Sequence, residues 1–96
     1  MRFDWDEDKN RRNLTKHRVS FETATAVFDD PHLVSLFDRE VDGEERWQSL
    51  GLIDGMIILL VVHAYREAQG DEVIWIISAR KATPTERRWY EKSHQE

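Results

Sequence analysis

The segment that most restricts the fold is Met56–Ala64, nine residues that are all apolar except His63. A membrane-spanning helix needs a run about twice as long, so this segment is predicted to be a central strand covered on both faces. It follows Asp54-Gly55, a dipeptide typical of two-residue β-hairpin turns. We therefore predict a partner strand over Arg46–Ile53, and a third long strand over Glu72–Ala79, which is rich in Val, Ile and Trp.

Helix-start signals organise the rest of the chain. Asp6-Glu7-Asp8 places carboxylates in the first turn of a polar helix, and Ser20 is a suitable N-cap for a second one. Thr83-Pro84-Thr85-Glu86 has the capping box and first-turn proline of a last helix. The three helices are predicted to end near His17, Asp29 and His94. The remaining strands are predicted over Phe3–Trp5 and Leu33–Phe37. Polar loops are predicted over Asp38–Glu45 and Tyr65–Asp71. This β-α-α-β-β-β-β-α order predicts an α+β fold, an antiparallel sheet covered by two N-terminal helices and one C-terminal helix.

Composition excludes several classes of protein. The chain has 96 residues, so we expect residues 1–96 to form a single domain. It has no cysteine, which excludes a disulfide scaffold, a thiol nucleophile and a zinc site built on sulfur. The four histidines show no ligand spacing, so we predict no metal site and no cofactor. Without an apolar signal segment or a membrane span, the protein is expected to be cytoplasmic.

Charge is distributed unevenly along the chain. The net charge is −5, which taken alone argues against nucleic acid binding. Residues 1–18, however, carry six basic and four acidic side chains, and residues 78–96 carry five basic and three acidic ones. Residues 29–46 carry two basic and seven acidic ones. If the two ends meet in the fold, they could form a local positive surface; the alternative is that the charges serve solubility.

Arg80 is the first candidate for chemistry, because it lies where a buried strand ends and a helix is about to begin. A guanidinium there can hold a phosphate with two donors; the alternative is that it pairs with Glu86. His63, with a reference pKa of about 6.5, could transfer protons, although such histidines are more often part of the core. Arg66 follows His63 and could add charge or simply be solvated. Antiparallel pairing would place His63 and Arg66 away from Arg80.

The two terminal helices supply further candidates. Glu86 and Tyr90 are four residues apart and share a helix face, which suits proton transfer and base stacking; the alternative is a capping glutamate beside a half-buried tyrosine. The first helix is so polar that its basic residues should be free for solvent or a ligand. The four tryptophans are expected mostly in core or edge positions. These basic residues and tryptophans are Lys9, Arg12 and Lys16, and Trp5, Trp47, Trp75 and Trp89.

A series of motifs spans almost the whole chain. The motifs are Phe3-Asp4-Trp5-Asp6 with Lys9, Asn13-x-x-Lys16-His17-x-Val19-Ser20-Phe21-Glu22, Val27-Phe28-x-Asp30-Pro31, Gly43-Glu44-Glu45-Arg46 and Ile76-Ile77-Ser78-Ala79-Arg80-Lys81-Ala82-Thr83-x-x-Glu86-Arg87-x-x-Tyr90. In this order they resemble the BrnT family, toxins of bacterial type II toxin–antitoxin systems. One departure is Arg18, where the family usually has glycine.

The resemblance implies a RelE-like fold and a metal-independent endoribonuclease that cleaves mRNA. It also implies a cognate antitoxin with a ribbon-helix-helix DNA-binding domain, through which the toxin reaches operator DNA. RNA supplies its own nucleophile, the 2′-OH, so the enzyme must orient it, move protons and stabilise charge on the phosphorane.

We assign roles for this reaction to ten residues. Arg80 would hold the scissile phosphate, Arg66 and Lys9 would add charge, His63 or Glu86 would exchange protons, and Tyr90 would orient or stack a base. The residues expected to bind RNA are Lys9, Arg12, Lys16, Lys81 and Trp5. The competing hypothesis is a module without catalytic activity that binds the antitoxin and acts as a transcriptional co-repressor.

Overall fold

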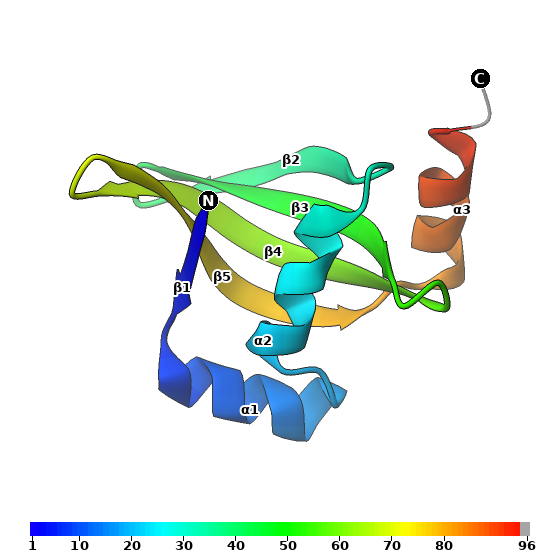
Figure 1. Ribbon diagram of the computed structural model, residues 1–96, viewed down its shortest axis with the longest axis horizontal. Coiled ribbons are helices and arrows are strands. Elements are labelled where there is room, and N and C mark those ends of the chain that lie inside the picture. The colour runs from blue at the N-terminus through cyan, green and yellow to red at the C-terminus, as the bar shows by residue number, and fades with distance from the viewer. Residues whose placement is uncertain (95–96) are drawn as a thin grey trace.

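The computed structural model describes residues 1–94 and contains a sheet with three α-helices and one 3-10 helix (Figure 1). The order of elements agrees with the predicted β-α-α-β-β-β-β-α, with one division in the second helix. Their bounds are β1 Arg2–Trp5, α1 Glu7–His17, α2 Phe21–Ala24, the 3-10 helix η1 Thr25–Asp29, β2 Val34–Val41, β3 Glu44–Ile53, β4 Ile57–Ala68, β5 Asp71–Lys81 and α3 Pro84–Lys92.

The five strands form one mixed sheet in the order β1-β5-β4-β3-β2. Strands β2 to β5 are antiparallel neighbours, whereas β1 pairs in parallel with β5, with Arg2 opposite Val73 and Trp5 opposite Ile76. The prediction of an antiparallel sheet is therefore wrong at β1. A tight turn dictates antiparallel pairing only between strands that follow one another, and the rest of the sheet separates β1 from β5 in the chain.

Three tight turns join the antiparallel strands. Asp54-Gly55, the predicted hairpin, has positive φ angles of 53° and 65°. Asp42-Gly43 and Gln69-Gly70 also have positive φ at both residues, which is the backbone of a type I′ hairpin. The predictions of loops over Asp38–Glu45 and Tyr65–Asp71 are therefore wrong, because most of these polar residues continue the strands. Their side chains lie at the exposed end of the sheet, where a strand can form without alternating apolar and polar side chains.

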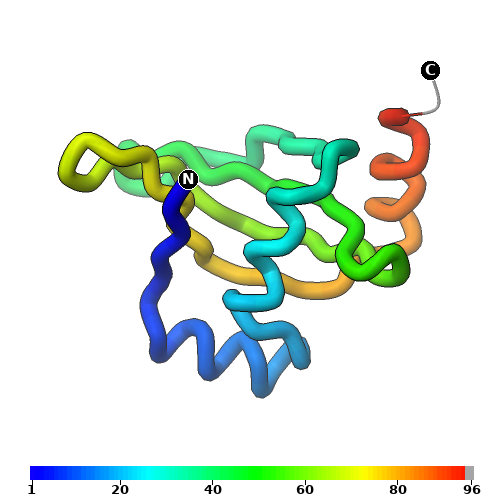
Figure 2. Tube along the Cα trace, viewed as in Figure 1, coloured from blue at the N-terminus to red at the C-terminus, as the bar shows by residue number. Residues whose placement is uncertain are grey.

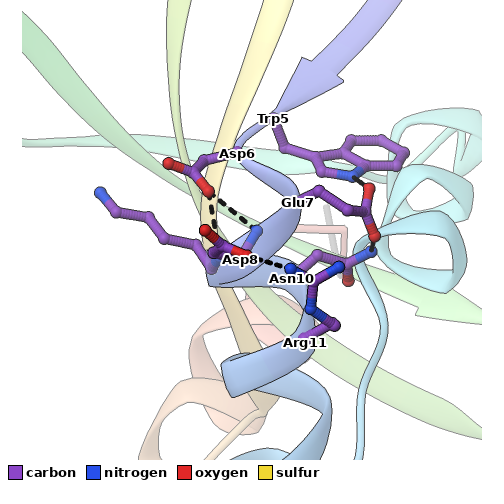
Figure 3. Close-up of polar contacts among 7 residues, drawn as sticks. Trp5, Asp6, Glu7, Asp8, Asn10 and Arg11 are labelled. Carbon is purple, nitrogen blue, oxygen red and sulfur yellow. Dashed lines mark hydrogen bonds and ion pairs between the residues drawn. The ribbon is translucent and has the colours of Figure 1, made fainter.

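Side-chain caps begin the helices where the sequence predicts. The Asp6 carboxylate accepts hydrogen bonds from the Asp8 and Lys9 amides (Figure 3). Ser20 caps α2, and Thr83 forms the full capping box with Glu86 at α3. The second helix, predicted as continuous, changes from α to 3-10 geometry after Ala24.

Helices α2 and η1 cover one face of the sheet, which we call face A (Figure 2). On β4, Leu59 and Val61 point into the buried cluster of this face. Leu60 points to the opposite face, face B, where it packs against Tyr90 of α3. Figure 2 shows α3 at the end of the sheet near the β3–β4 turn, while the β2–β3 and β4–β5 turns lie at the other end. The latter end of face B therefore lies beyond the reach of α3.

Helix α1 lies along the β5 edge of the sheet. The Asn13 side chain donates to the Ala79 carbonyl at 2.8 Å and accepts from the Ala79 amide at 3.2 Å, as a neighbouring strand would. Nδ2 of Asn13 also donates to the Val19 carbonyl at 2.8 Å. Asn13 therefore satisfies part of the exposed edge of β5 and fixes the position of the helix beside it.

Candidate functional site

Arg80 lies on face B, opposite Leu60 of β4, and its guanidinium forms a fork with Glu86. Nη1 donates to Oε1 at 2.8 Å and Nη2 to Oε2 at 3.0 Å, which is the pairing that the sequence left open as the alternative. The Arg80 side chain is nevertheless 36% exposed, against 12% for Glu86. Among residues 1–94, no hydrogen bond engages Nε of Arg80. The Nε–Nη2 side of the guanidinium is therefore available for a second anion.

Glu86 has a mainly structural set of contacts. Its carboxylate accepts the Arg80 fork and also the Thr83 amide at 2.9 Å, within the capping box. The hydrogen bond from Arg80 holds the pKa of Glu86 below its usual value, and it raises the pKa of Arg80. Both groups are thus charged at neutral pH, and Glu86 orients Arg80. A carboxylate with a lowered pKa is a weak proton acceptor, which does not favour the proton-transfer role assigned to Glu86.

A cationic row on α1 borders the C-terminal half of β5. Lys9, Arg12 and Lys16 line an open groove of about 360 Å³ together with Ser78. Ser78 lies opposite Val62 and Arg80 opposite Leu60, so both point to face B. The structure therefore brings basic side chains from the first helix close to the strand that carries Arg80. Lys81 is separate: it ends β5, opposite Leu59, and lines another cavity of about 580 Å³ between α3 and the β3–β4 turn.

His63 is completely buried on face A, away from Arg80. Its Nε2 lies 2.6 Å from Oγ of Ser49, and its ring packs edge-on against Phe28 with centroids 4.9 Å apart. Burial lowers the pKa of His63 to about 4. His63 therefore matches the alternative interpretation of the sequence, in which this histidine is part of the core. Since RNA cannot reach a side chain without exposed surface, the placement does not favour His63 as a catalytic residue.

Tyr90 holds α3 against the sheet. Its hydroxyl donates to Asp30, whose carboxylate also accepts the Leu52 amide at 2.7 Å. Burial and the bond to Asp30 raise the pKa of Tyr90 to about 12. Burial alone would raise the pKa of Asp30, but the hydrogen bonds from Leu52 and Tyr90 lower it overall. With its hydroxyl engaged and its ring packed against Leu60, Tyr90 is not positioned to stack a base.

Trp5 is half-buried and packs against the core. Its ring packs edge-on against Phe21 with centroids 6.0 Å apart, and its indole Nε1 donates to Glu7 at 3.0 Å (Figure 3). These contacts lie on face A, whereas Arg80 is on face B. The placement therefore agrees with the core position expected for most tryptophans and does not favour RNA binding by Trp5.

Arg66 lies at the turn end of face B, in a cluster that the sequence did not reveal. Its Nε donates to Glu44 at 2.8 Å and its Nη2 at 3.1 Å, and its guanidinium carbon lies 4.2 Å from the ring centre of Trp75. The bond from Arg66 lowers the pKa of Glu44. Glu44 fell within a predicted loop, so no strand register pointed to this contact.

The structure separates Arg66 from Arg80. Arg66 lies opposite Val73 of β5, whereas Arg80 lies opposite Leu60 of β4. Leu60 and Arg66 are six positions apart on β4, which corresponds to about 20 Å. The separation expected for antiparallel strands is confirmed, and the ten assigned residues do not form one compact site.

The described residues also bear on metal binding and on membrane insertion. Among residues 1–94, no three or more His, Cys, Asp or Glu side chains are grouped so that they could hold a metal ion. None of the helices found in that part of the chain has the length and apolar character needed to cross a membrane.

Comparison with known proteins indicates a family. The sequence model described as "Ribonuclease toxin, BrnT, of type II toxin-antitoxin system" matches residues 5–86. The crystal structure of the ribonuclease toxin BrnT from Brucella abortus is similar, with a TM-score of 0.62 and 25% sequence identity. The similarity covers 86% of this chain and 97% of that one. A comparison with curated protein sequences found no match.

Proposed function

Because the chain belongs to the BrnT family of ribonuclease toxins of type II toxin–antitoxin systems, we propose that it cleaves mRNA in the cytoplasm without a metal ion. In this proposal a cognate antitoxin with a ribbon-helix-helix domain neutralises the toxin and links it to operator DNA. The architecture belongs with the RelE-like ribonucleases. The observation that carries the proposal is the pre-oriented guanidinium of Arg80 on face B, on the strand whose Ser78 shares a groove with the cationic row of α1.

Arg80 supplies the charge that the reaction needs. Attack of the 2′-OH places additional negative charge on the phosphorane oxygens, and a guanidinium held by Glu86 can meet that charge without reorganising. Its free Nε–Nη2 side offers two parallel donors, which match two phosphate oxygens. Because Arg80 and Glu86 are already paired, the side chain spends little conformational entropy on binding the substrate.

The cationic row of α1 supplies binding and orientation. Lys9, Arg12 and Lys16 are exposed and point along one side of the helix toward the groove with Ser78. Contacts of this kind hold the phosphates that flank the scissile one, and they place the 2′-OH in line with the leaving oxygen. The net charge of −5 is then compatible with RNA binding, because this surface is locally positive.

The test is RNA cleavage by the purified protein in the presence of a chelator. Arg80→Ala should reduce the cleavage rate by about two to three orders of magnitude, since it removes the principal electrostatic contact. Arg80→Lys keeps the charge but loses the fork, and it should also be slow. The matched control is Arg88→Ala, which removes an exposed arginine of α3 whose one side-chain hydrogen bond within residues 1–94 is to Thr85; this variant should cleave normally. Full activity of folded Arg80→Ala would reject the assignment.

The alternative is an antitoxin-binding module that acts as a co-repressor without cleaving RNA. The pairing of Arg80 with Glu86 favours it, because an ion pair already satisfies part of the guanidinium. Such a protein would not arrest growth when expressed alone and would leave purified RNA intact, yet it would still bind the antitoxin. Growth arrest by the wild type but not by Arg80→Ala would exclude this alternative.

A further inference from the structure

The cluster of Arg66, Trp75 and Glu44 on face B is built like a recognition site. All three side chains come from different strands: Glu44 from β3, Arg66 from β4 and Trp75 from β5. Glu44 takes the Nε–Nη2 side of the guanidinium, whose carbon lies over the Trp75 ring, 4.2 Å from its centre. The Arg66 side chain is nevertheless 40% exposed, so its outer surface faces solvent.

The free parts of Arg66 suit a nucleobase. No hydrogen bond within residues 1–94 uses Nη1, so the end-on donors of the guanidinium remain available for acceptors on a base edge. The Arg66 side chain is also partly exposed, and unpaired RNA bases stack on guanidinium planes. Because Glu44 and Trp75 already fix the side chain, binding a base requires little further ordering.

Glu44 makes Arg66 less suited to a phosphate than Arg80 is. Its carboxylate occupies the Nε–Nη2 side of the Arg66 guanidinium, the side that stays free on Arg80, so that pair of donors is not offered to phosphate oxygens. Arg46 contacts the same carboxylate, with its Nε 3.4 Å from Oε1, and helps to hold Glu44 in place. Stacking of a base needs only the guanidinium plane, which this pairing leaves unchanged.

The spacing along the sheet gives the position of the base in the substrate. Arg66 and Arg80 are separated by about 20 Å along β4. Three backbone bonds of a peptide span 3.8 Å, so the six of one nucleotide span roughly 6 to 7 Å when extended. About three nucleotides are therefore needed to bridge the two arginines.

We propose that Arg66, held by Glu44 and backed by Trp75, stacks a nucleobase of single-stranded RNA about three nucleotides from the phosphate bound by Arg80. This inference rests on the proposed function and adds to it a minimum length of substrate on one side of the cleavage site. Arg66 then acts as a positioning residue and not at the scissile phosphate.

The first experiment compares variants on RNA of different lengths. A twelve-nucleotide RNA that spans a cleavage site of the wild type is shortened stepwise from either end. The wild type should lose about tenfold in kcat/KM when the third nucleotide on one side is removed, as expected for the loss of one stacked base. Arg66→Lys, which keeps the charge but not the plane, and Trp75→Leu should show that loss on the long RNA and no further loss on the short one. Phe37→Leu is the control, since Phe37 is 54% exposed but lies on face A against Trp47.

The second experiment measures binding without cleavage. A fluorescein-labelled twelve-nucleotide 2′-O-methyl oligoadenylate lacks the attacking hydroxyl, and its affinity should fall about tenfold in Arg66→Lys and in Trp75→Leu. If the wild type cleaves no RNA but shows this pattern of binding, the proposed function fails and the base site stands. If cleavage is normal but both variants match the wild type on every length and in binding, the base site is refuted. If the cluster served only to hold the strands together, the variants would be less stable, and their loss of kcat/KM would not depend on the length of the RNA; that result also refutes the base site.

Discussion

Lowering the pH from about 7 to about 5 should destabilise the fold through the buried imidazole of His63. In the unfolded chain its pKa is the ordinary 6.5, whereas burial between Ser49 and Phe28 lowers it to about 4 in the folded protein. Between these two values the unfolded chain binds a proton that the folded chain does not. The free energy of unfolding must therefore decrease as the pH falls through this window, by about 2 kcal/mol between pH 7 and pH 5.

The pH range of this effect distinguishes the titration of His63 from that of the carboxylates. Glu44 and Glu86 have pKa values below their ordinary 4.5, so the stability that they contribute is present above that value and is lost only at lower pH. Urea unfolding followed by tryptophan fluorescence at the two pH values gives the change in free energy. His63→Gln, which can still meet the Ser49 hydroxyl but cannot titrate, should lose most of the pH dependence.

A direct observation can refute this reasoning. The NMR signals of the His63 ring in the folded protein should show a neutral imidazole at pH 5. If that ring instead titrates near 6.5, or if His63→Gln keeps the full decrease in stability between pH 7 and pH 5, then burial of His63 is not the cause.

Three further predictions concern the stability of the fold and can be measured by urea or thermal unfolding. Arg18 has a left-handed backbone with φ of 61° at the end of α1, so Arg18→Gly should stabilise the protein by about 1 kcal/mol; no gain would contradict that backbone. A Cβ at Gly51 would lie 2.6 Å from Cγ1 and 2.8 Å from the carbonyl oxygen of Val27, so Gly51→Ala should cost about 2 kcal/mol, and wild-type stability would show that η1 can move away. Asn13→Ala removes three hydrogen bonds to Ala79 and the Val19 carbonyl and should cost about 2 to 4 kcal/mol, whereas a loss under 1 kcal/mol would mean that water replaces the amide.

Much of the fold was accessible from local patterns. The Asp54-Gly55 turn, the central strand after it and the capping box at Thr83 depend on residues that are close in the chain, and all three are confirmed. The polar hairpins at Asp42-Gly43 and Gln69-Gly70 were missed, because strands at an exposed end of a sheet need no apolar side chains. The parallel pairing of β1 was missed for another reason, since no local signal joins residues separated by the rest of the sheet.

The site shows the same division more sharply. The sequence was sufficient to identify the family motifs, the pairing of Arg80 with Glu86 as one of two alternatives, and the separation of Arg66 from Arg80. Only the tertiary structure decided that His63 is buried on face A and that Arg66 rests on Trp75. Side-chain pairing within a helix or across a tight turn follows from spacing along the chain. Burial and contacts between strands depend on the register and on which face of the sheet the helices cover, and those are properties of the assembled fold.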